Sequence, residues 1–71
     1  MQVFMVKLKD DQSWSMTDSD GETISQGAMN NPADGLTKAI AHLHHQSKRI
    51  VSCLQLANYP SHDATILIVT G

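Results

Sequence analysis

The sequence predicts an α+β fold in which one helix packs on a small, mostly antiparallel sheet, with the element order β-β-β-α-β-β. Two observations carry this prediction. Short segments in which apolar and polar residues alternate, as in half-buried strands, are separated by clusters of turn-forming residues. One stretch in the middle of the chain has the cap residues and the apolar spacing of a helix. With 71 residues, the chain is expected to form a single domain, 1–71.

The first strand is expected over residues 3–9, and a hairpin turn over residues 10–13 leads to the second. Because side chains alternate between the two faces of a strand, three apolar residues share one face of the first strand: Phe4, Val6 and Leu8. Trp14 and Met16 on the second strand are expected to point inward as well.

A second turn is predicted at residues 18–21, where Gly21 favours a positive φ. Residues 22–26 follow as a short third strand that only Ile24 anchors. This strand is the last element before the helix.

The helix is predicted to start with Asn31 as its N-cap, Pro32 at the first helical position and Asp34 in the first turn. Its apolar residues follow helical spacing: Leu36, Ala39, Ile40 and Leu43. Lys48 and Arg49 lie near its expected end, where positive charge is favourable.

Residues 50–56 are expected to return as a strand. On simple alternation, Ile50, Leu54 and Leu56 share one face of it, with Val51 and Cys53 on the other.

After a loop at residues 58–63, residues 64–70 form the last strand. Its unbroken apolar run, residues 66–69, is typical of a strand covered on both faces. Either this strand is central in the sheet, or a partner covers it.

Composition limits the functions to consider. A hydrophobic fraction of 41% and a charged fraction of 17% are ordinary for a globular domain. The single Cys53 excludes an internal disulfide, so self-association or a partner protein is the expected supplement to a small core. No apolar run is long enough for a membrane span and no signal peptide is recognised, so we expect a cytoplasmic protein without a membrane partner.

Charge is distributed unevenly along the chain. The formal net charge is -2, but six of the seven acidic residues lie between positions 10 and 34. On a helical wheel, four basic or titratable residues fall within a sector of about 60°: Lys38, His42, His45 and Arg49. This row would suit phosphates or an acidic protein face, and the alternative is an ordinary solvated helix face.

No set of residues predicts catalysis, a metal or a cofactor. His42 and His45 are close in sequence, but they lack the glutamate and the third ligand of zinc-binding helices. Ser61, His62 and Asp63 are the residue types of a hydrolytic triad, yet consecutive side chains diverge.

Two single residues could also carry a function. Cys53 is expected to be unreactive among the apolar residues of its strand. Trp14 is expected in the core, with a role as an interface anchor as the alternative.

Three segments resemble the N-terminal domain of HicB-type antitoxins: residues 14–18, residues 24–27 and residues 32–40. The resemblance implies a β-β-β-α-β domain that binds and blocks a small ribonuclease toxin, commonly as an oligomer. The chain departs from that family at residues 18–21, where Asp-Ser-Asp-Gly stands in place of the family's Pro-Asp-Leu-Pro-Gly.

Together these observations predict a small non-enzymatic protein-binding module: an inhibitor, an antitoxin-like protein or an accessory regulator. Its partner is another protein or a second copy of the chain, as a homodimer. The candidate partner-binding residues are Lys38, His42, His45, Arg49 and Trp14. The alternative function is a nucleic-acid-associated regulator that uses the basic, histidine-bearing helix face.

Overall fold

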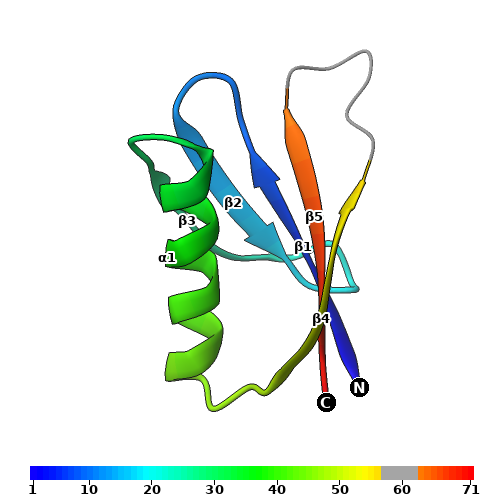
Figure 1. Ribbon diagram of the computed structural model, residues 1–71. Coiled ribbons are helices and arrows are strands. Elements are labelled where there is room, and N and C mark those ends of the chain that lie inside the picture. Colours follow the sequence, from blue (N-terminus) through cyan, green and yellow to red (C-terminus); the bar gives the residue numbers. More distant parts are fainter. Residues whose placement is uncertain (57–62) are drawn as a thin grey trace.

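The computed structural model describes residues 1–56 and 63–71. The loop predicted at residues 58–63 lies outside them except for Asp63. Six elements follow one another along the chain (Figure 1): β1 (Gln2–Leu8), β2 (Ser13–Thr17), β3 (Thr23–Ala28), α1 (Pro32–His45), β4 (Ile50–Leu56) and β5 (Ala64–Thr70). This order confirms the predicted α+β fold.

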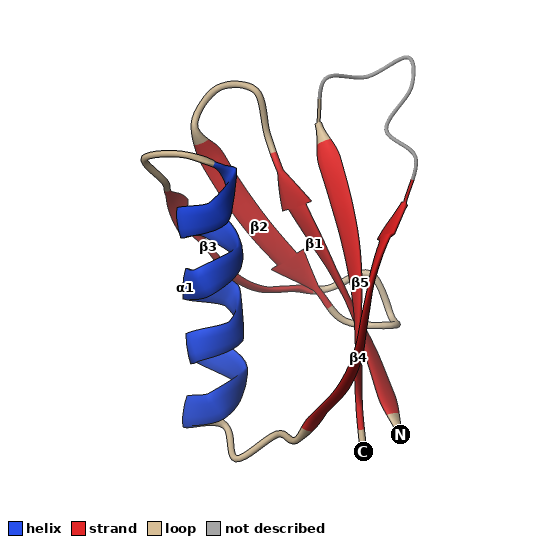
Figure 2. Cartoon of the chain, viewed as in Figure 1, coloured by secondary structure: helices blue, strands red, loops and turns tan. Residues whose placement is uncertain are grey.

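The strands form one sheet in the order β3-β2-β1-β5-β4, and every neighbouring pair is antiparallel. Helix α1 lies on one face of this sheet, where it packs on β1, β2 and β3 (Figure 2). Strand β5 lies inside the sheet, between β1 and β4, which is the first of the two alternatives for its unbroken apolar run.

The core fills the space between α1 and the sheet. The predicted inward-facing residues of the first two strands are buried: Phe4, Val6, Leu8, Trp14 and Met16. Ile66 and Ile68 of β5 and Ala39 and Leu43 of α1 complete this layer.

The start of α1 confirms the predicted cap. The side-chain oxygen of Asn31 accepts a hydrogen bond from the backbone N–H of Asp34 at 2.9 Å, and Asp34 Oδ2 accepts one from the N–H of Asn30 at 2.9 Å. The N–H of Asn30 and the ammonium of Lys38 together hold the pKa of Asp34 below its ordinary value. The cap thus satisfies the N–H of Asp34, a helix-end donor that would otherwise lack a partner, and the bond from Asn30 fixes the chain just before the cap.

Gly35 in the first turn lets the helix approach the sheet closely. A Cβ atom at this position would overlap the sulphur of Met29 and would lie only 3.0 Å from Cδ2 of Leu8. The unfavourable helix propensity of glycine, about 1 kcal/mol relative to alanine, is therefore offset by packing that a larger residue would prevent.

The end of α1 differs from the prediction, because the helix stops at His45, before Lys48 and Arg49. The N–H of Lys48 donates to the carbonyl of Leu43, and the N–H of Ser47 donates to that of His44, both at 3.0 Å. Ser47 takes a left-handed conformation, with φ of 58°. This pair of bonds is a Schellman motif, which reverses the chain sharply toward β4.

Replacing Ser47 by glycine is expected to raise the free energy of unfolding by about 0.5 to 1 kcal/mol. Glycine adopts the left-handed conformation without strain, although part of the gain is lost to its greater freedom in the unfolded chain. Urea denaturation measures the change. Ser25→Gly in β3 is the control and is expected to destabilise, so a loss of stability in both variants would contradict the prediction.

A bulge at the start of β4 overturns the predicted distribution of its side chains. Ile50 pairs with Thr70 of β5, but Ser52 pairs with Val69, which lies on the other face. Ile50 therefore packs against the core on the α1 side of the sheet, whereas Leu54 and Leu56 lie on the opposite face. The prediction that these three residues share a face is wrong.

Candidate functional site

An apolar surface lies on the sheet face opposite α1. Residues that are directly opposite each other on neighbouring strands share a face. Met5 of β1 pairs with Leu67 of β5, which pairs with Leu54 of β4, so these three side chains form one row across the sheet. All members of the surface are partly or fully exposed, and we call it the open face: Val3, Met5, Leu54, Leu56, Leu67 and Val69.

Polar residues border the open face. Thr17 and Ser15 of β2 lie beside it across β1, and Lys7 and Thr65 lie at one end. An apolar centre with a polar margin is the usual arrangement of a protein–protein interface.

Strand β4 forms the edge of the sheet next to the open face. It pairs only with β5, so its outer edge faces no described strand. From Ile50 to Leu56 it contains no charged residue and no proline, the devices that usually protect an edge strand from pairing with another chain. Val51 is 53% exposed and Leu54 is 58% exposed. Among the described residues, no strand occupies the outer edge of β4, so this edge offers a place for an additional strand.

The other edge strand, β3, is chemically different. Its sequence from Thr23 to Ala28 is mostly polar or small, and α1 packs on one of its faces. Gly27 weakens it as a template for pairing, because glycine favours extended backbone poorly and offers no side chain. The two edges of the sheet thus differ in the contacts that they offer.

Cys53 lies in the middle of β4 and is exposed. The expectation that apolar neighbours shield it is wrong. Its backbone partner is Ile68, so its side chain is on the α1 side of the sheet. Helix α1 packs on β1, β2 and β3 and leaves this part of the face open.

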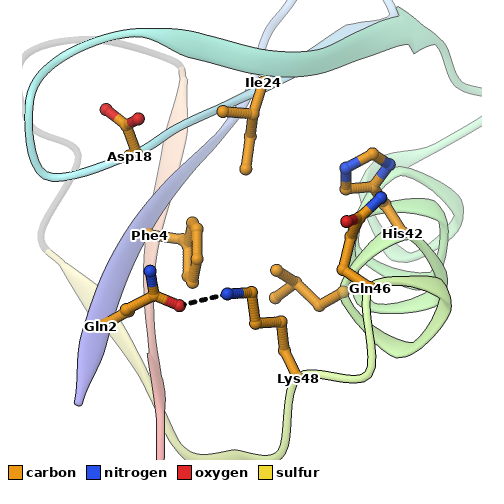
Figure 3. A pocket seen from close by; sticks show the side chains of 8 residues that line it. Gln2, Phe4, Asp18, Ile24, His42, Gln46 and Lys48 are labelled. Atoms are coloured by element: carbon orange, nitrogen blue, oxygen red, sulfur yellow. Dashed lines mark hydrogen bonds between the residues drawn. The ribbon is translucent and has the colours of Figure 1, made fainter.

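A cavity of about 390 Å³ lies between the last turns of α1 and the sheet (Figure 3). Phe4, Ile24 and Leu43 are its apolar lining, and Asp18, His42 and Gln46 are among the polar residues. Figure 3 also shows the ammonium of Lys48, which donates a hydrogen bond to Gln2 Oε1. Its charged groups have both signs, so the cavity favours no single class of ligand.

Among the described residues, no group of three or more His, Cys, Asp or Glu side chains is placed to hold a metal ion. Ser61 and His62, two of the three triad residue types in the sequence, lie outside those residues. Asp63 Oδ1 accepts a hydrogen bond from the backbone N–H of Asp10. In the same part of the chain, no helix is both long enough and apolar enough to cross a membrane.

The predicted row on α1 is not a continuous stripe. The Lys38 ammonium lies 3.2 Å from Asp34 Oδ2 and donates to the carbonyl of Ala28, toward the start of the helix. Arg49 follows the end of α1, so its position on a helical wheel is wrong.

Between Lys38 and Arg49, the remaining members of the row are His42 and His45, and both lie in α1. His42 is partly buried and lines the cavity, while His45 is exposed. That this part of the surface binds phosphates or an acidic protein stays a prediction.

Trp14 is only 6% exposed and belongs to the core, as expected. It faces Gly27 on β3, and its indole nitrogen lies 3.3 Å from the position that a Cβ of Gly27 would occupy. A partner protein does not reach Trp14 in this conformation, so burial argues against its alternative role as an interface anchor.

The outer edge of β4 is a candidate binding site that the sequence alone does not reveal. The seven uncharged residues 50–56 are a signal for it, but only the strand order shows that they lie at an edge.

Comparison of the chain with known protein families, with curated proteins and with solved structures finds no match. The resemblance to HicB-type antitoxins therefore stays a prediction from the three segments that carry it.

Proposed function

We propose that this chain is a non-enzymatic protein-binding module that holds an extended segment of another protein chain against β4. The observation that supports the proposal is the exposed, uncharged outer edge of β4 beside the open face. In strand addition, the main chain of the bound segment supplies a ladder of hydrogen bonds, and its alternate side chains supply selectivity.

The open face indicates which side chains the bound segment presents. Every second residue of an added strand would extend the rows that contain Leu54 and Leu56. Apolar residues at these positions would enlarge the buried area, whereas charged ones would be costly to desolvate. An inhibitor, an antitoxin-like protein or an accessory regulator would each use such an edge.

Selection from a random heptapeptide library, followed by titration of the chosen peptides, tests this proposal. We expect apolar, β-prone peptides to be enriched, and Leu54→Lys to weaken their binding at least about tenfold, as loss of an anchoring contact does. Hydrogen exchange should show that the bound peptide protects amides of residues 50–56.

Gln26→Lys is the matched control, because Gln26 is exposed on the other edge strand and lies on the same face as the open face. It should leave peptide affinity within about twofold of the wild-type value, since it lies outside the proposed site. Failure to select any peptide, or equal losses in both variants, would refute strand addition at β4.

A further inference from the structure

We propose that the segment bound by β4 is β4 of a second copy of this chain, paired antiparallel. Two five-stranded sheets would then join into one continuous sheet of ten strands. This inference rests on the proposed function, because it names the partner of the same edge.

In the register that we consider, the centres of the two β4 strands coincide. A twofold axis perpendicular to the sheet relates two antiparallel copies of one strand. When the axis passes through Cys53, the central residue of β4, residues 51–55 of the two copies overlap and Cys53 faces its own symmetry mate. The bulge after Ile50 leaves Ile50 and Leu56 out of this regular pairing, because they lie on opposite faces of the sheet. Ser52 then lies opposite Leu54 of the second copy, and Val51 lies opposite Gln55 of that copy.

Charge does not oppose this pairing. Neither β4 nor β5 contains a charged residue. Six of the seven acidic residues lie between positions 10 and 34, so they belong to other elements and turns. Bringing two copies together along β4 therefore places no like charges opposite each other within the strand pair.

The open faces of the two copies become continuous in this arrangement. The row Val3, Val69 and Ser52 of one copy runs into the row Leu54, Leu67 and Met5 of the other. Five of these six side chains are apolar, and Leu54 loses much of its exposure at the junction. The second copy thus covers the most exposed part of the apolar surface.

A second copy also suits the size of the domain. A chain of 71 residues buries only about 60% of the surface that its unfolded state exposes. Small domains without disulfides or metals commonly gain stability by association. A self-complementary edge supplies such association without a different partner.

Cross-linking through Cys53 tests the register. Opposite residues of an antiparallel pair have Cα atoms about 4.5 to 5.5 Å apart, within the range of about 4.4 to 6.8 Å that a disulfide spans. Treatment with diamide, which accepts the two electrons of disulfide formation, should convert most of the wild-type protein to a covalent dimer. The control Cys53→Ser/Gln26→Cys carries its thiol on β3 and should remain mostly monomeric.

Sedimentation equilibrium in reductant tests the association itself. The wild-type chain should show twice the mass of the monomer, and Leu54→Lys should raise the dissociation constant at least about tenfold. Gln26→Lys should leave it unchanged. Because Leu54 is exposed, the variant should stay folded, and unchanged fluorescence of the buried Trp14 verifies this.

The outcomes separate the two proposals. A chain that is monomeric but still binds extended peptides at β4 overturns the inference that a second copy is the partner, and leaves the proposed function standing. A monomer that binds no peptide overturns both. A dimer that Leu54→Lys does not weaken, or one in which Cys53 is cross-linked no faster than the β3 control, places the contact elsewhere and overturns the inference.

Discussion

Replacing Leu43 by alanine is expected to lower the free energy of unfolding by about 2 to 5 kcal/mol. Leu43 is 1% exposed and lies on the buried side of α1. Truncating its side chain removes apolar contacts and leaves a cavity that the surrounding structure refills only in part. Since a domain of this size is stabilised by only about 4 to 10 kcal/mol, the variant should lose much of its stability at room temperature.

Urea denaturation followed by Trp14 fluorescence measures this loss. Leu54→Ala is the matched control, because it makes the same chemical change at a side chain that is 58% exposed. At concentrations low enough to keep the chain monomeric, the control should change the free energy of unfolding by less than about 0.5 kcal/mol. Similar losses in the two variants would contradict the described packing of α1 on the sheet.

Replacing Gly35 by alanine is expected to destabilise the domain by about 1 to 3 kcal/mol, which is typical of overpacking. Helix propensity alone predicts a gain of about 1 kcal/mol. The added methyl group, however, overlaps the sulphur of Met29 and lies 3.3 Å from Cβ of Trp14. Met29 is itself buried, so its side chain has little room to move away.

Thermal denaturation of a double-mutant cycle tests the cause. Combining Gly35→Ala with Met29→Ala should recover part of the loss, because the truncated side chain leaves room for the new methyl group. Ala41→Gly, at an exposed helix position, measures the propensity term separately and should cost about 1 kcal/mol. A stabilising Gly35→Ala would show that α1 and the sheet are not in close contact.

The two ends of α1 show where sequence reasoning succeeds and where it fails. The start is predicted correctly because its signal is local: Asn31, Pro32 and Asp34 are side chains whose own chemistry forms the cap. The end is missed because Ser47 occupies the left-handed position at which glycine is the usual signal. With no glycine there, the pattern of basic residues extends the predicted helix too far.

The strands show a similar contrast. Alternation predicts the buried face of β1 correctly, since nothing interrupts its period of two. In β4 a single bulge after Ile50 inverts the faces, and alternation does not reveal an extra residue.

The candidate site depends on a property that no local pattern contains. The pattern of residues 50–56 predicts an ordinary half-buried strand, and the apolar run of β5 predicts a strand covered on both faces. Only the pairing of β5 with β1, which are far apart in the sequence, puts β4 at the edge. The sequence therefore predicts an apolar surface, but it does not show where the molecule exposes it.

The pairing of β1 with β5 also bears on how fast the chain folds. It places Gln2 beside Thr70, and the two ends of the chain lie next to each other in Figure 1. The hairpins β1–β2 and β2–β3 need only short loops to close, whereas β1 and β5 meet only after nearly the whole chain has been brought together. Loop closure costs more entropy as the loop lengthens, and folding slows as contacts become less local. We expect the arrival of β5 at β1, rather than formation of α1, to limit the rate of folding.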